Sequence, residues 1–191
     1  MNNVGILLFD DVEVLDFAGP YEVFSVTGQR NGEGYFNVFT VSEKKLVKAV
    51  NGLKVIPDYN LNNHPTIDIL VIPGGSGARA AIKRDTLLSW VEKISDNSEY
   101  VLSVCTGSLI LAKVGLLYDL EATTHHSCYD LLKELDSSLI LKKERFVDNG
   151  SIITAAGVSA GIDASMYLIE KILGEKISKE TAKYIEYPYY K

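Results

Sequence analysis

The sequence predicts an α/β protein, an open and mostly parallel sheet between two layers of helices, and three observations support this prediction. Short apolar runs alternate with helical patterns through most of the 191 residues. Most of these runs are continuously apolar, which is typical of parallel strands buried on both faces. The length suits one domain, with no internal repeat, low-complexity segment or linker. We therefore expect residues 1–191 to form a single domain.

Apolar runs predict the strands of this sheet. They span residues 4–9, 36–41, 68–72, 100–104 and 151–154. The segment 44–60 differs, because Asn51-Gly52 stands between two apolar stretches and this dipeptide favours a tight hairpin turn. We expect a small antiparallel excursion there.

Helices are predicted where apolar side chains recur at helical spacing. Gly19-Pro20 precedes the first such segment, and proline is well tolerated in a first turn, so this helix is expected to begin there. Ser159 is the predicted N-cap of the last long helix and Gly174 its C′ residue. The other predicted helices cover residues 87–94, 108–114, 131–135 and 160–173.

Composition and charge exclude several classes of function. Hydrophobic residues make up 47% and charged residues 23%, the balance of a soluble globular protein. The net charge is -6 and no run of lysine and arginine offsets it, so neither nucleic acid nor a membrane surface is an expected partner. The apolar runs are too short to span a membrane, and no basic segment precedes the first one. We expect a cytoplasmic protein.

One strand end carries a cysteine between small residues, and ligands bind at the carboxyl ends of strands in open parallel sheets. Cys105 follows the strand 100–104, with Ser103 and Gly107 on either side. Such neighbours permit the sharp, strained turn of a nucleophile elbow. The following helix N-terminus would favour the thiolate. We predict that Cys105 is a nucleophile; the alternative is a small cysteine buried in the core. For Cys128 we predict this second role, a buried packing residue.

Two other strand ends supply candidate partners for this thiol. Gly74 and Gly75 can bring backbone amides close to a substrate and, with the amide of Thr106, would form an oxyanion hole. The alternative is an ordinary tight turn. Asp16 lies among apolar residues, which raises a carboxyl pKa and suits an acid/base partner. Its alternative role is helix capping.

No pattern indicates a metal or a nucleotide cofactor. His125 and His126 are adjacent, so their side chains point in different directions, and no further ligand stands at a suitable spacing. Residues 74–77 lack the Lys-Ser/Thr of a P-loop. Asp163 lies in the first turn of a predicted helix, where an acid is favourable without any function. We expect neither a metal nor a cofactor.

Several segments resemble the ThiJ/PfpI superfamily, which is class I glutamine amidotransferase-like. They are Ile-Pro-Gly-Gly at 72–75, Ser-Val-Cys-Thr-Gly-Ser at 103–108, Ala-Thr-Thr-His at 122–125 and Ala-Gly-Ile-Asp at 160–163. The resemblance runs nearly end to end, and residues 15–20 and 103–109 resemble the isonitrile hydratase branch. It implies a flavodoxin-like sandwich, usually a homodimer, with a cysteine at the elbow.

The resemblance also implies a reaction and a set of residues. Isonitrile hydratases add water to the carbon of R–N≡C and release an N-substituted formamide without a cofactor, so the expected partner is a small-molecule substrate. Cys105 matches the essential cysteine, Asp16 the essential acid and Thr106 the neighbouring threonine. Gly74, Gly75 and His125 are the candidate substrate-binding residues.

Two departures from the family pattern leave other functions open. Peptidase-type members carry a histidine directly after the nucleophile, where this chain has Thr106, and near relatives have an aromatic residue where it has His126. Alternatives are an amidase, a protease-related or glyoxal-handling enzyme, and a non-enzymatic redox-sensing or ligand-binding domain. Similar domains are fused to helix-turn-helix regulators, but after Ile177 we expect only a short helix and the tyrosine-rich tail 187–190.

Overall fold

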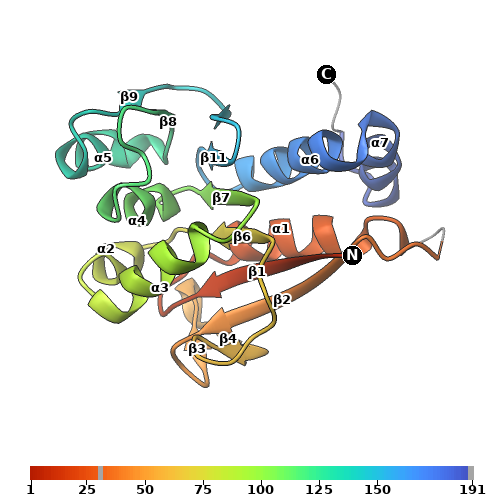
Figure 1. Ribbon diagram of the computed structural model, residues 1–191, viewed down its shortest axis with the longest axis horizontal. Helices are drawn as coiled ribbons and strands as arrows, with labels where there is room; N and C mark the ends of the chain where they lie inside the picture. The colour runs from red at the N-terminus through yellow and green to blue at the C-terminus, as the bar shows by residue number, and fades with distance from the viewer. Residues whose placement is uncertain (30–31, 189–191) are drawn as a thin grey trace.

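A seven-stranded sheet runs through the middle of the molecule, in the order β10-β11-β7-β6-β1-β2-β5, with helices on both faces (Figure 1). The computed structural model describes residues 1–29 and 32–188. Neighbouring strands are parallel except for the antiparallel pair β10 and β11. The predicted α/β fold is confirmed. The strands are β1 (Asn2–Leu8), β2 (Phe36–Ser42), β5 (Tyr59–Asn60), β6 (Ile69–Ile72), β7 (Tyr100–Val104), β10 (Phe146–Asp148) and β11 (Ile152–Ala155).

The central strands β1, β6 and β7 are buried over most of their length. All four residues of β6 are inaccessible to solvent, as are Ile6 and Leu7 on β1 and Leu102 on β7. Because helices cover both faces, neither set of alternating side chains meets water, and both must be apolar. This burial is the physical reason for the continuous apolar runs of the sequence.

The helices form two groups of contacting elements. Helices α1 (Val14–Val26), α6 (Ala160–Leu173) and α7 (Glu175–Tyr184) contact one another, and α4 (Gly107–Lys113) contacts α2 (Ala78–Ala81) and α5 (Tyr129–Leu135). Helix α3 (Asp85–Ser95) precedes β7. None of the described helices is long and apolar enough to cross a membrane.

Helix α1 begins earlier than predicted. Pro20 lies inside the helix, whose N-cap is Glu13, rather than in its first turn. Proline disfavours a helix interior, but the packing of α1 against α6, with Gly19 close to Ile162, overrides that local preference. Asp16 therefore lies in the first helical turn, and its predicted alternative role as a cap at Gly19-Pro20 is wrong.

The hairpin predicted around Asn51-Gly52 is present. β3 (Val47–Lys48) and β4 (Lys54–Val55) pair antiparallel, and Asn51 and Gly52 both have positive φ, at 64° and 91°. A three-residue helical turn, η2 (Val50–Gly52), connects the strands. A second small sheet, β8 (Glu121–Ala122) with β9 (Ile140–Leu141), was not predicted, because strands of two residues leave no readable pattern.

The last long helix has the predicted bounds, and Gly174 ends it with a φ of 90°. Ser159 precedes the helix but makes no capping hydrogen bond; its Oγ instead accepts one from Arg145 Nη2 at 3.0 Å. The expected short helix is α7. In the tail, Tyr189 and Tyr190 lie outside the described residues.

Gly107 gives a test of how tightly the start of α4 packs. A Cβ here would overlap the backbone carbonyl oxygen of Ile72, so Gly107→Ala should lower the free energy of unfolding by at least about 2 kcal/mol. Gly34→Ala is the matched control, because the nearest atom to its Cβ would be Met1 Sδ at 3.7 Å. Urea unfolding measures both. Equal stability of the two variants would contradict the tight packing.

Candidate active site

Cys105 occupies a strained turn between β7 and α4. Its φ is 56°, which is rare for a residue with a side chain, and it is only 5% exposed. Its N–H donates to the carbonyls of Ala155 and Ala156 at 3.1 and 2.9 Å. Its carbonyl accepts from Thr124 Oγ1 at 3.0 Å and Ser108 Oγ at 3.1 Å. These hydrogen bonds hold the turn that the sequence predicts as a nucleophile elbow.

Asp16 is fully buried beside this thiol. Its Oδ2 accepts a hydrogen bond from the Gly74 N–H at 3.0 Å. Its Oδ1 is buried with no partner that meets full hydrogen-bond geometry among the described residues. Burial raises the pKa of Asp16 from 3.8 to about 7, against the lowering effects of the Gly74 N–H and of the interaction with the Cys105 thiol. The raised pKa expected from the apolar neighbours is therefore present.

The pKa of the Cys105 thiol is raised, whereas the sequence predicts a favoured thiolate. Burial, followed by the charge of Asp16, raises the pKa of Cys105 to about 12, although the backbone N–H groups of Val158 and Thr106 lower it. The Thr106 N–H at the start of α4 favours the thiolate, as expected, but desolvation outweighs this effect and the thiol is the stable form. Above about pH 7 the pair rests as a carboxylate beside a thiol, and the carboxylate can accept the proton of the sulfur.

The two glycines connect the ends of β6 and β7. Thr106 Oγ1 accepts from the Gly75 N–H at 2.9 Å and donates to the Gly75 carbonyl at 3.0 Å. A Cβ on Gly74 would overlap Thr106 and come to 3.0 Å from Asp16 Oδ2. The amides of Gly74 and Gly75, predicted as donors of an oxyanion hole, instead donate to Asp16 Oδ2 and to Thr106 Oγ1. In this structure they position Asp16 and Thr106.

Sequence reasoning missed Val158. This residue lies between β11 and α6 and has a φ of 45°, an outlier for a β-branched side chain. Its N–H, like that of Thr106, interacts with the Cys105 thiol and lowers its pKa. Because β11 is the neighbour of β7, the strand-end rule points to this segment. The sequence does not predict a positive φ at Val158, because valine normally avoids this conformation.

His125 borders the site without bonding to the sulfur. Its Nδ1 pairs with Ser127 Oγ at 2.8 Å, and its ring lies 4.2 Å from that of His126. In the described part of the chain, no hydrogen bond joins His125 to Cys105. Burial, then the charges of His126 and Arg79, lower the pKa of His125, which favours the neutral ring.

The second cysteine also has a polar neighbour. Cys128 is buried, as expected for a packing residue, and its Sγ accepts a hydrogen bond from Arg79 Nη2 at 3.1 Å. Within residues 1–29 and 32–188, no three histidine, cysteine, aspartate or glutamate side chains cluster in a way that could hold a metal ion.

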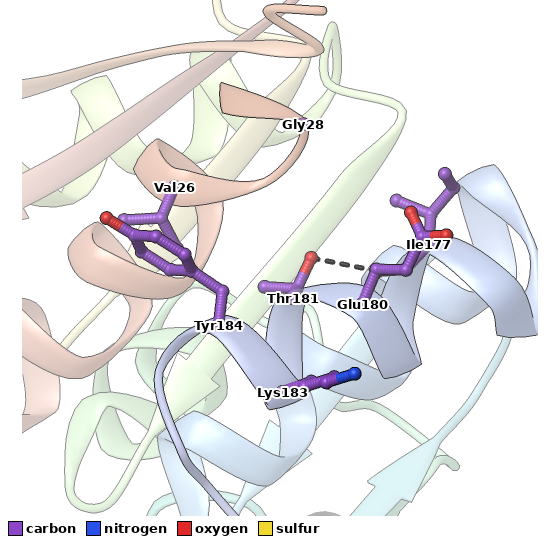
Figure 2. Close-up of a pocket in the computed structure, with 7 residues that line it drawn as sticks. All are labelled: Val26, Gly28, Ile177, Glu180, Thr181, Lys183 and Tyr184. Atoms are coloured by element: carbon purple, nitrogen blue, oxygen red, sulfur yellow. Dashed lines mark hydrogen bonds between the residues drawn. The ribbon is translucent and has the colours of Figure 1, made fainter. Parts of the chain in front are cut away.

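A separate pocket of about 180 Å³ lies between α1 and α7, and Figure 2 shows its lining. None of the residues predicted from the sequence lines it. Thr181 is one of its lining residues, and its Oγ1 donates to the Ile177 carbonyl at 2.9 Å. The lining residues are Val26, Gly28, Ile177, Glu180, Thr181, Lys183 and Tyr184.

The fold and this site define an α/β protein with a cysteine on a nucleophile elbow and a buried acid beside it. The model of the DJ-1/PfpI family matches residues 2–171. The chain belongs to this family, as the resemblance to the ThiJ/PfpI superfamily predicted.

Known relatives cover most of the chain. It is 32% identical to isonitrile hydratase from Pseudomonas putida, over 96% of this chain and 78% of that one. It is 25% identical to the HTH-type transcriptional regulator GbdR from Pseudomonas aeruginosa, over 92% of this chain but 48% of the regulator. A solved ThiJ/PfpI family protein from Pseudomonas syringae matches with a TM-score of 0.88 and 28% identity, over 98% of this chain and 75% of that one.

The burial of Asp16 predicts a pH-dependent stability. Because the pKa is higher in the folded than in the unfolded chain, ionisation opposes folding; the penalty is absent below about pH 4 and grows to about 4 kcal/mol above pH 7. Asp16→Asn removes it. In urea unfolding, this variant should therefore be more stable than the wild type at about pH 8 and gain little near pH 4.

Asp148→Asn is the matched control with the opposite sign. Burial raises the pKa of Asp148, but hydrogen bonds from Lys171, Tyr167 and Gly150 together lower it by more than burial raises it, so the net shift is downward. This variant should be less stable than the wild type at about pH 8, and the difference should shrink as the pH falls. A stability difference for Asp16→Asn that does not change with pH would contradict the raised pKa.

Proposed function

We propose that this protein is a cofactor-free, cysteine-dependent hydratase that converts a small apolar isonitrile to an N-substituted formamide. The observation that carries the proposal is the buried carboxyl of Asp16 beside the Cys105 thiol, with Oδ1 left without a regular hydrogen bond. The 32% identity to an isonitrile hydratase supports this choice of substrate class.

The first step adds the thiol across the isonitrile carbon. The Asp16 carboxylate accepts the proton of Cys105 while the sulfur forms a bond to that carbon. Asp16 then returns the proton to the same carbon, which gives the thioimidate R–N=CH–S–Cys105. No net charge or proton is gained, so the step requires only the pair of residues that the fold buries together.

The second step is hydrolysis of the thioimidate. Asp16, again a carboxylate, takes a proton from a water molecule as the water oxygen adds to the carbon, and it then gives this proton to the imine nitrogen. In the resulting R–NH–CH(OH)–S–Cys105, Asp16 takes the hydroxyl proton as the C=O bond forms and the C–S bond breaks, and it returns this proton to the sulfur. The products are the formamide R–NH–CHO and the restored thiol.

In this scheme the backbone amides of Thr106 and Val158 stabilise the negative charge on the sulfur. Both N–H groups interact with the Cys105 thiol and lower its pKa. They stabilise the sulfur as its proton leaves, and again when the C–S bond breaks. The hydroxyl of Thr106, bonded twice to Gly75, acts in positioning rather than in holding water.

A second candidate is a ligand-binding domain without turnover, and one observation favours it. The chain matches a transcriptional regulator over 92% of its own length but only 48% of the regulator's. In that case isonitriles or other small molecules would bind and leave unchanged. The homodimer and the cytoplasmic location implied by the resemblance and the composition stay predictions.

Replacing the two cysteines separates these candidates. Cys105→Ala should lower formamide production from a simple alkyl isonitrile at least about 1000-fold, because the nucleophile is lost. Cys128→Ala is the matched control, since it removes the other buried thiol, and it should keep turnover within about threefold. Chromatography of the formamide measures both. No formamide from the wild type would refute the hydratase and favour the ligand-binding domain.

The pH dependence tests the base. Turnover needs the Asp16 carboxylate, so kcat/KM should rise with pH through an apparent pKa of about 7 and then level off. The profile is measured with an uncharged isonitrile, so that only the protein titrates. A profile that falls across the same range would show that the protonated carboxyl is the active form.

A further inference from the structure

The turn that brings Val158 to the sulfur is strained. Residues 156–159 connect β11 to α6, and Val158 has a φ of 45° within it. Such a conformation costs about 1–3 kcal/mol and persists only where the surroundings hold it. The question is which residues of this chain supply that support.

Arg145 contacts the turn on both sides of Val158. Its carbonyl accepts a hydrogen bond from the Ala156 N–H at 3.0 Å, before the strained residue. Its guanidinium Nη2 donates to Ser159 Oγ at 3.0 Å, directly after it. The same guanidinium pairs through Nε with Asp163 Oδ2 in the first turn of α6.

Asp163 is itself held in place from the other side. Its Oδ1 accepts a hydrogen bond from Tyr187 Oη at 3.0 Å. The carboxylate therefore has a partner on each oxygen, and the planar guanidinium bonds to it and to Ser159 at once. The guanidinium carries its donors in a fixed planar fork, so Nε and Nη2 reach the two partners from one side-chain position.

We propose that Arg145 is a positioning residue of the thiol site. It fixes the 156–159 turn against Cys105, whose N–H donates to the Ala156 carbonyl at 2.9 Å, so that the Val158 N–H stays beside the sulfur. The sulfur is taken as the reacting atom, so this role rests on the proposed function. The Arg145 side chain is 48% exposed, and exposed ion pairs add little to global stability. Its loss should act on the turn and leave the fold intact.

The protein offers a matched control at the far end of the same helix. Lys171 pairs with Asp148 of β10 at 2.8 Å, and Asp148 accepts a hydrogen bond from Tyr167 Oη at 2.6 Å. This arrangement repeats the cation, carboxylate and tyrosine of the Arg145 cluster and joins α6 to the same edge of the sheet. The Lys171 ammonium donates to both oxygens of Asp148 and to the Gly150 carbonyl, all of them outside the 156–159 turn.

The test compares Arg145→Gln with Lys171→Gln, each in a Cys128→Ala background so that Cys105 is the only thiol. The rate of alkylation by iodoacetamide is followed against pH. Arg145→Gln should slow alkylation about three- to tenfold and move the rate curve to higher pH, because a hydrogen bond to the thiolate is weakened. Lys171→Gln should follow the parent curve, and thermal unfolding checks that both variants fold.

Ser159→Ala gives a second measurement that spares the ion pair. It removes only the hydroxyl that Arg145 holds, and should shift the alkylation curve in the same direction by a smaller amount. An unchanged curve for Arg145→Gln, or equal shifts for Arg145→Gln and Lys171→Gln, would overturn the proposal. Alkylation needs no isonitrile, so a wild type that forms no formamide would refute the hydratase and leave this result to be judged separately.

Discussion

The burial of one carboxyl against one thiol is the constraint on which the rest of the site depends. Neither Asp16 nor Cys105 can keep its charge well solvated, and each anion disfavours the other. Above about pH 7 the pair therefore holds a single negative charge, and that charge can move with a proton from one atom to the other. An arrangement of this kind is ready to add a neutral S–H to an electrophile without exchanging protons with the solvent.

Maintaining this pair requires local conformations that the chain would not otherwise adopt. Cys105 and Val158 both have positive φ, and they lie at the ends of the adjacent strands β7 and β11. Hydrogen bonds between the two turns, from the Cys105 N–H to the carbonyls of Ala155 and Ala156, connect the strained positions. The sheet supplies the rigid frame, and both strained residues lie beside the sulfur at the carboxyl ends of its strands.

The accuracy of the sequence predictions follows from how local each signal is. The buried strands and the elbow cysteine were readable, because apolar runs and small flanking residues are adjacent in the chain. Pro20 was misplaced, since the packing of α1 on α6 decides where that helix begins. The acidity of Cys105 was overestimated because nearby backbone N–H groups lower its pKa while burial raises it, and only the folded structure shows which effect is larger. Val158 and Arg145 could not be found, since their roles exist only after β10, β11 and α6 have assembled.

The pair of hydrogen bonds between Thr106 and Gly75 restricts which amino acids this position can hold. One oxygen atom both donates to a carbonyl and accepts from an amide of the same residue, a task that only a hydroxyl performs. A histidine here, as in the peptidase-type members of the superfamily, would present separate nitrogen atoms and could not join the two strand ends in this way. The residue after the nucleophile therefore has one of two roles. A histidine places a second ionisable group beside the sulfur. A threonine joins the two strand ends through a neutral group, and Asp16 is then the sole acidic partner of the sulfur in the described structure.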